Sequence, residues 1–80
     1  MLSQLENSAK VVGAKQTKRA LRDGKAARVY LAKDADPMLT EPVEALSMEH
    51  QVEVEWISTM KDLGNACGIA VGAAVAAMLI

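Results

Sequence analysis

Aromatic residues are almost absent from this sequence. Its 80 residues include one tyrosine, Tyr30, one tryptophan, Trp56, and no phenylalanine. Proteins that hold single-stranded nucleic acid by stacking use several aromatic rings on one surface. The sequence therefore argues against that mode of recognition, and it leaves hydrogen bonds, charge and aliphatic contacts as the means of binding.

Cysteine and histidine occur once each, as Cys67 and His50. A single cysteine excludes an intrachain disulfide and a multi-cysteine zinc site, and it suits a reducing compartment, so we expect a cytoplasmic protein. Asp34 and Asp36 have no histidine or third acid close by, which favours a solvated turn over a metal or catalytic site. Because no nucleophile–base pair and no phosphate-loop motif is present, the sequence predicts neither an enzyme nor a bound cofactor.

Charges of the two signs are not mixed along the chain. Residues 10–33 hold eight lysines and arginines against one acid, a net charge of +7, whereas residues 34–62 hold eight acids against Lys61, a net charge of −7. The formal total is only −1. Because local charge governs the attraction to phosphates, the near-neutral total does not exclude a nucleic-acid partner.

The stretch Val11-Val12-Gly13-Ala14-Lys15-Gln16-Thr17-Lys18-Arg19 runs from apolar residues through a glycine into a basic segment that reads as the start of a helix. A glycine accepts positive φ and lets another backbone approach closely. The helix start offers unpaired N–H groups and a partial positive charge, which suit a phosphate. The cations supply further phosphate contacts, and the amide of Gln16 can read a base edge. This stretch predicts a contact with nucleic acid, and we favour RNA.

Hydrophobic spacing and turn residues predict eight alternating elements. We expect helices at residues 2–9 and 15–23 and a third helix capped by Thr40 with Pro42 in its first turn. A fourth helix is expected from Thr59 to Cys67, because Thr59-Met60-Lys61-Asp62 matches a capping box. The third helix is expected to bury Leu39, Val43 and Leu46. Strands are expected at residues 10–12, 28–32 and 52–56 and at the chain end. The alternation predicts an α/β fold, a three-layer α/β/α sandwich around a four-stranded mixed sheet, in one domain covering residues 1–80.

The last 18 residues, 63–80, carry no formal charge and have glycines at Gly64, Gly68 and Gly72. Small residues at this spacing also occur where membrane helices pack. A membrane span, however, needs about 20 strongly apolar residues, and this segment is rich in alanine and glycine and contains Asn65. We favour a helix end, a glycine-rich loop and a buried central strand.

Three segments in this order resemble the kink-turn-binding ribosomal protein family of the L-seven-Ae type. They are Gly13-Ala14-Lys15-Gln16-Thr17-Lys18-Arg19, Ala32-Lys33-Asp34-Ala35-Asp36-Pro37 and Leu63-Gly64-Asn65-Ala66-Cys67-Gly68-Ile69. The resemblance covers Val12 to Leu79 and is typical of a small bacterial member. It implies an α/β/α sandwich that binds kink-turns, which are RNA duplexes bent sharply at a bulge followed by tandem sheared G·A pairs.

The resemblance also implies roles for particular residues. The family motif Gly-Thr-Asn-Glu with a later lysine reads Gly13-Ala14-Lys15-Gln16 with Arg19 here, so Lys15 and Gln16 are expected at the G·A bases and Arg19 at base edges or phosphates. Gln16 adds donors where the family has an acceptor-only acid, and Lys15 replaces an amide by a point charge. Asp36 takes the position of a Glu that contacts a flipped-out nucleotide in the family. The loop Ile69-Ala70-Val71 is expected to cover the bulged nucleotides with aliphatic side chains. The expected RNA-binding residues are Gly13, Ala14, Lys15, Gln16, Lys18, Arg19, Lys33, Asp36, Ile69, Ala70 and Val71.

The expected partner is thus a structured RNA that contains a kink-turn, either ribosomal RNA or a riboswitch. We expect the protein to bind it as a monomer and not to associate with a membrane. A simpler interpretation is that the basic helix is a solvated face and Ile69 a core residue. The alternative function is a protein-interaction module without RNA specificity. A third hypothesis is a tail-anchored membrane peptide. Preference for kinked over straight RNA separates the first two, and solubility without detergent tests the third.

Overall fold

The computed structural model describes residues 9–80. Its elements are β1 (Lys10–Val12), α2 (Ala14–Arg22), β2 (Ala26–Ala32), α3 (Pro37–Glu49), β3 (Val54–Ile57), α4 (Met60–Ala66) and β4 (Val75–Leu79). The alternation expected from the sequence is confirmed for these seven elements. The helix predicted at residues 2–9 lies almost wholly outside the described residues.

The four strands form one mixed sheet in the order β1-β4-β2-β3. β4 runs antiparallel to both of its neighbours, β1 and β2, whereas β2 and β3 are parallel. The apolar chain end is therefore a central strand, as predicted, with Val75, Ala76 and Ala77 fully buried. Within residues 9–80, none of the helices has the length and apolar character that a membrane crossing requires.

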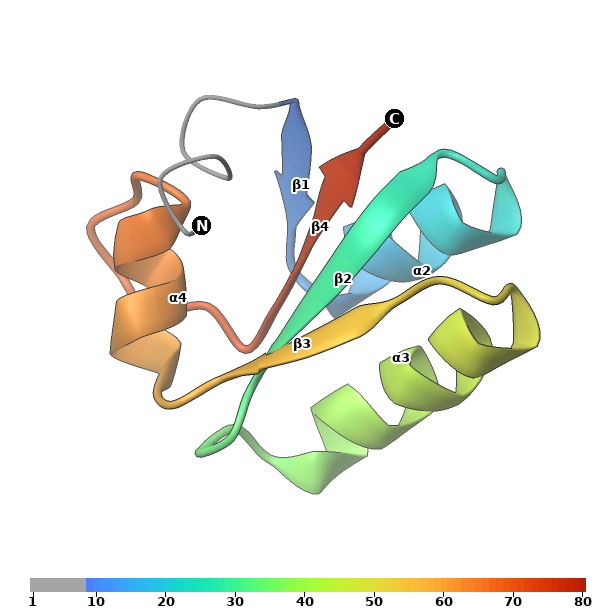
Figure 1. Cartoon of the computed structure of the whole chain (residues 1–80). Coiled ribbons are helices and arrows are strands. Elements are labelled where there is room, and N and C mark those ends of the chain that lie inside the picture. Colours follow the sequence, from blue (N-terminus) through green and yellow to red (C-terminus); the bar gives the residue numbers. More distant parts are fainter. Residues whose placement is uncertain (1–8) are drawn as a thin grey trace.

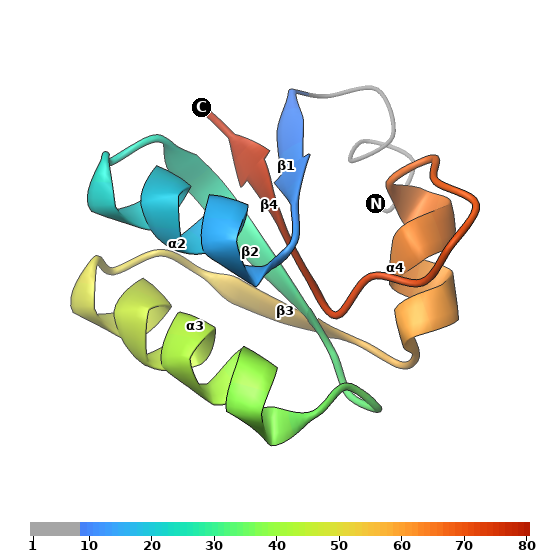
Figure 2. The same cartoon turned by 180° about the vertical axis from the view of Figure 1, so that it is seen from behind.

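Helices cover both faces of the sheet, which confirms the three-layer α/β/α sandwich (Figures 1 and 2). α2 and α3 lie side by side on one face, and α4 lies on the other. Alternate residues of each strand therefore face different helices. In β2, Val29 and Leu31 pack towards α2 and α3, whereas Tyr30 and Ala32 pack towards α4.

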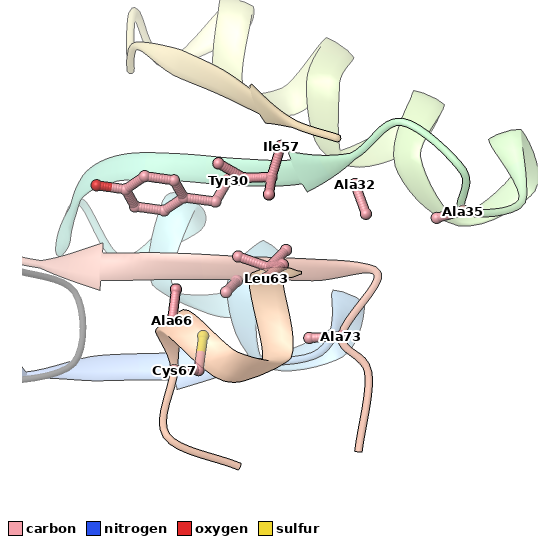
Figure 3. Close-up of a cluster of buried hydrophobic side chains, with 9 residues drawn as sticks. Tyr30, Ala32, Ala35, Ile57, Leu63, Ala66, Cys67 and Ala73 are labelled. Atoms are coloured by element: carbon pink, nitrogen blue, oxygen red, sulfur yellow. The ribbon is translucent and has the colours of Figure 1, made fainter. Parts of the chain in front are cut away.

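Each face of the sheet has its own hydrophobic core. On the α4 side, Tyr30 and Ile57 meet Leu63 and Cys67 (Figure 3). On the other side, Leu31 belongs to a cluster to which α2 and α3 contribute three buried side chains, Ala20, Leu21 and Val43. Apart from Tyr30, both clusters consist of small and aliphatic residues, so a chain with only two aromatic residues still fills its interior.

The start of α3 differs from the sequence prediction. Asp36 caps the helix, because its Oδ1 accepts a hydrogen bond from the Met38 N–H at 2.9 Å, and Pro37 takes the first helical position. Thr40 is a buried residue of the first turns, not the cap, and Pro42 lies inside the helix. A proline at the first position has a suitable φ and needs no N–H partner, which favours this earlier start.

The earlier start also changes which residues of α3 are buried. The stripe facing the sheet is Thr40, Val43 and Ser47, and the Ser47 hydroxyl donates to the Val43 carbonyl at 2.8 Å. Val43 was predicted correctly, and Leu46 is half-buried, but Leu39 is exposed. The inner face of the helix therefore carries two small polar residues, Thr40 and Ser47, whereas the apolar Leu39 lies on its outer side.

Two further predictions concern the second half of the chain. β3 begins at Val54, two residues later than expected, and Trp56 is half-exposed on this outermost strand. Thr59 caps α4 as predicted, since its Oγ1 accepts from the Asp62 N–H at 3.0 Å. Gly68, with φ 77°, follows the helix end as expected.

Burial of Cys67 makes the fold sensitive to alkaline pH. Burial raises the pKa of its thiol above the ordinary value of 9.0, with the charge of Lys10 acting in the opposite direction. The unfolded chain therefore loses its thiol proton first as pH rises, and the stabilisation from the neutral buried thiol, complete below about pH 9, is lost above it. We expect the free energy of unfolding, measured by urea denaturation, to fall as the pH rises above about 9, and to fall less in Cys67→Ala. Equal slopes in the two proteins would contradict this assignment.

Candidate nucleic-acid interface

The ends of three strands and the start of the fourth meet at one edge of the sheet. Val12, the last residue of β1, pairs with Ala76 of β4, and Ala32, the last residue of β2, pairs with Ile57, the last residue of β3. Leu31 pairs with Val75, the first residue of β4. The segments that leave these strand ends are therefore neighbours in space (Figure 1). They contain most of the residues predicted to bind RNA.

Backbone and side-chain hydrogen bonds tie these segments together. The Gly13 N–H donates to the Val75 carbonyl at 2.8 Å, and the Ala32 N–H donates to the Ala74 carbonyl at 3.0 Å. Asp34 Oδ1 accepts from the Met60 N–H at 2.7 Å. The Met60 carbonyl in turn accepts from the Ala73 N–H at 3.0 Å. The loops after β1, β2 and β3 and the loop before β4 thus form one connected surface.

Gly13 turns the chain from β1 into α2. Its φ of 103° and ψ of 153° lie in a region that favours glycine. A Cβ added at this position would meet no atom within 4 Å, so the requirement is one of backbone conformation and not of space. This open position leaves room for another molecule to approach the glycine backbone closely.

The first turn of α2 presents unpaired donors next to this glycine. The Thr17 N–H donates to the Gly13 carbonyl at 3.0 Å as the first bond of the helix, so the N–H groups of Ala14, Lys15 and Gln16 have no helical partner. The first turn contains no acid and has no side-chain cap. Lys15 and Gln16 are exposed, whereas Thr17 is buried. The helix start therefore offers amide donors and positive charge to an external acceptor.

Arg19 lies one turn further along α2 and shares a small hollow with Gln16. The hollow has a volume of about 130 Å³. The hollow is lined by aliphatic side chains and by side chains of both charge signs. These residues are Val11, Gln16, Arg19, Ala20, Asp23, Lys25 and Leu79. Arg19 is exposed and Lys18 is half-buried. Both cations lie on α2, beyond its first turn.

Lys33 and Asp36 follow β2 at the same edge of the sheet. The Lys33 N–H donates to the Ile57 carbonyl at 2.8 Å, and its side chain is exposed. Asp36 is also exposed, but one of its carboxylate oxygens caps α3. The second oxygen has no partner among the described residues and can accept a hydrogen bond from a ligand.

The loop before β4 adds aliphatic surface. Val71 is 71% exposed and Ala70 is exposed, whereas Ile69 is half-buried against the core on the α4 side. The loop is held by α4, because the Ile69 N–H donates to the Gly64 carbonyl at 3.1 Å. Of the three, Ala70 and Val71 offer the open apolar contact, and Ile69 supports them from below.

Two residues of this surface were not predicted to belong to it. Lys61 lies exposed in the first turn of α4, which begins at the same edge of the sheet, and it forms no ion pair with a described residue. The Thr59 capping box was the signal that could have placed it there. Asp34 links two loops through Met60, a role that the local sequence does not reveal. Within residues 9–80 no three His, Cys, Asp or Glu side chains group as metal ligands would.

Comparison with known proteins assigns the chain to a family. Residues 2–80 match the model of the ribosomal protein L7Ae/L30e/S12e/Gadd45 family. The chain belongs to this family. Among its relatives, RNA-binding protein GK0100 of Geobacillus kaustophilus is 52% identical over 69 residues, which cover 86% of this chain and 84% of that protein. The large ribosomal subunit protein eL8 of Halobacterium salinarum is 35% identical over 68 residues, covering 84% of this chain and 57% of that protein.

A solved structure has the same fold. The 15.5kD RNA binding protein of Giardia lamblia superimposes with a TM-score of 0.92 at 26% sequence identity, covering 99% of this chain and 70% of that chain. The family match over residues 2–80 confirms the predicted membership in the ribosomal protein family.

Proposed function

We propose that residues 1–80 form a single RNA-binding domain that recognises and stabilises kink-turns in structured RNA. The observation that carries the proposal is the joining of the Gly13 turn, the open start of α2 and the aliphatic loop before β4 at one edge of the sheet. Membership in the L7Ae/L30e/S12e/Gadd45 family and relatives named RNA-binding proteins support it.

In this proposal the start of α2 reads the G·A pairs of the kink. Lys15 and Gln16 project from a helix start whose amides are unpaired, so side-chain and backbone donors face the same acceptors. The absence of a Cβ at Gly13 lets the RNA backbone approach. Arg19 supplies a fork of donors for a base edge or a phosphate, and Lys18 and Lys33 add phosphate contacts without sequence preference.

The opposite side of the surface covers the bulged nucleotides in this proposal. Ala70 and Val71 offer exposed aliphatic carbons to an unstacked base, with Ile69 packed beneath them. The second carboxylate oxygen of Asp36, which has no partner within residues 9–80, accepts a hydrogen bond from a flipped-out nucleotide. Aliphatic cover suits a chain whose two aromatic rings lie on other parts of the fold.

The mechanism is selective binding. A bulged RNA exchanges between straight and bent forms, and a protein that contacts the bent form preferentially shifts the population towards it. No catalytic step or cofactor is required. The natural partner is a ribosomal RNA or a riboswitch that contains a kink-turn, and we expect the protein to bind it as a monomer in the cytoplasm.

Titration into a kink-turn RNA labelled with a fluorophore pair and kept free of magnesium tests the proposal. A variant RNA in which the G·A pairs are replaced by Watson–Crick pairs is the control. We expect the protein to bend the first RNA and not the second. Equal weak binding to both RNAs, lost at moderate salt, would show non-specific phosphate attraction and would favour a protein-interaction module instead.

A further inference from the structure

The outward face of α3 carries large apolar side chains, although it faces solvent. Met38 is 81% exposed and Met48 72% exposed, and Pro42 and Ala45 between them are also exposed. Positions 38, 42, 45 and 48 follow the i, i+4, i+7, i+10 spacing that places side chains on one side of a helix. We call these four residues the methionine face. The buried stripe of the same helix, which starts at Thr40, lies on the opposite side.

A solvent-facing helix side is normally polar, so this arrangement calls for a partner. Methionine has a flexible and polarisable side chain that adapts to different apolar surfaces, and it is enriched where proteins bind other proteins. Leu39, which is 47% exposed, extends the apolar surface at the start of the helix. Three of the six large exposed apolar side chains within residues 9–80 therefore belong to α3.

The charge around the methionine face is negative. Glu41 and Glu49 lie among its residues on the exposed side of α3, with Glu44 beside them, and none of the three forms an ion pair with a described residue. The sequence contains no lysine or arginine between Lys33 and Lys61. Negative charge of this density repels phosphates and attracts cations, so RNA is not the occupant.

A second copy of the chain does not fit either. In a two-fold contact the same glutamates of both copies would face each other, which is unfavourable. In a contact between α3 of one copy and the basic helix α2 of another, Lys15 and Arg19 would be covered and could no longer bind RNA. A different protein with positive charge beside an apolar stripe matches both properties of the face.

We propose that the methionine face of α3 is a docking surface for a basic amphipathic helix of another protein. The apolar stripe of that helix lies along Met38, Ala45 and Met48, and its lysines or arginines pair with the flanking glutamates. α3 starts at the edge of the sheet that carries the proposed RNA surface and runs away from it beside α2 (Figure 2). RNA and the second protein can therefore be held at the same time.

A synthetic peptide serves as the probe. It has about 18 residues, with leucines on one helical face and lysines on its flanks, and a scrambled peptide of identical composition is the control. Titrated into the nitrogen-15-labelled protein, the amphipathic peptide is expected to shift the amide signals of residues 38–49 and to bind at least about tenfold more tightly than the scrambled one. Equal affinities, or shifts spread over the other acidic segments, would overturn the proposal.

Variants separate the apolar from the charged contribution. Met38→Gln/Met48→Gln is expected to weaken peptide binding about tenfold or more, because the apolar contact is lost, whereas Ile80→Gln, at a residue 87% exposed at the chain end, is expected to leave it unchanged. Glu41→Gln/Glu49→Gln is expected to weaken it and to make it less dependent on salt, with Asp23→Asn as the control.

Three other outcomes also decide the matter. The double methionine variant should bind kink-turn RNA as the unchanged protein does, which shows that it is folded. If RNA alone shifts residues 42–49, which lie beyond the Asp36 cap, the face belongs to the RNA site and the proposal fails. If the unchanged protein dimerises in sedimentation experiments and the double methionine variant does not, a second copy covers the face and the proposal fails in the same way.

Discussion

Replacing Gly64 by alanine is expected to lower the free energy of unfolding by about 2 kcal/mol. Gly64 lies inside α4, against the loop before β4, and an added Cβ would overlap the Val71 carbonyl oxygen and stand 3.0 Å from the Gly72 Cα. These are backbone atoms, which cannot rotate away as a side chain would. Overpacking of this kind costs about 3 kcal/mol, and the better helix propensity of alanine offsets about 1 kcal/mol of it.

The same substitution should also weaken RNA binding. The loop that would have to move carries Ala70 and Val71, the exposed aliphatic residues of the proposed RNA surface. Urea denaturation measures the stability, and titration with kink-turn RNA below the unfolding transition measures the binding. Asn65→Ala, an exposed neighbour on the same helix, is the control and should change stability by no more than about 0.5 kcal/mol. Equal stabilities of Gly64→Ala and the unchanged protein would show that the loop can move freely away from α4.

The order of elements could be predicted because each has a strong local signal. The alternation of apolar segments, the Thr59 capping box and the uncharged alanine-rich end predicted α4 and the central strand β4. A buried strand between two others needs no polar side chains, and small ones such as Ala76 and Ala77 allow helices to pack closely on both faces. These signals do not depend on distant parts of the chain.

The start of α3 was predicted wrongly because two residues could cap the helix. Asp36 and Thr40 are both good cap residues, and each precedes a proline by one or two positions. Asp36 was interpreted as a turn residue, and a turn followed by Pro37 is also how this helix begins. The choice depends on which side of the helix packs on β2, and burying Val43 with Thr40 and Ser47 decides it. That packing cannot be read from local sequence.

Contacts between loops were the second gap in the sequence prediction. The three motifs named most residues of the surface, but not how their segments are joined. The Asp34–Met60 hydrogen bond joins residues from two different loops, and the close approach of Gly64 to Val71 fixes the loop before β4 against α4. A single sequence carries no signal for such pairs, because an aspartate in a turn and a glycine in a helix each have ordinary local explanations.

Removing Lys15 and Arg19 together is expected to abolish most of the preference for kinked RNA. Both side chains are exposed on the first two turns of α2, beside the unpaired amides of the helix start. A residue that contacts bases contributes about 1–3 kcal/mol, so Lys15→Ala/Arg19→Ala should lose at least about 2 kcal/mol, or roughly 30-fold, if the two effects add. The loss should be large for kink-turn RNA and small for a plain duplex.

The matched control is Arg22→Ala/Lys25→Ala, which removes the same charge from the last residue of α2 and from the connection between α2 and β2. Both of its side chains are exposed, so neither variant should disturb the fold. Loss of two phosphate contacts should lower affinity by a similar factor for kinked and plain RNA and reduce the salt slope by about 2. If both double variants lose affinity equally on both RNAs, the start of α2 contributes charge alone. Recognition of the kink would then have to come from the aliphatic loop before β4.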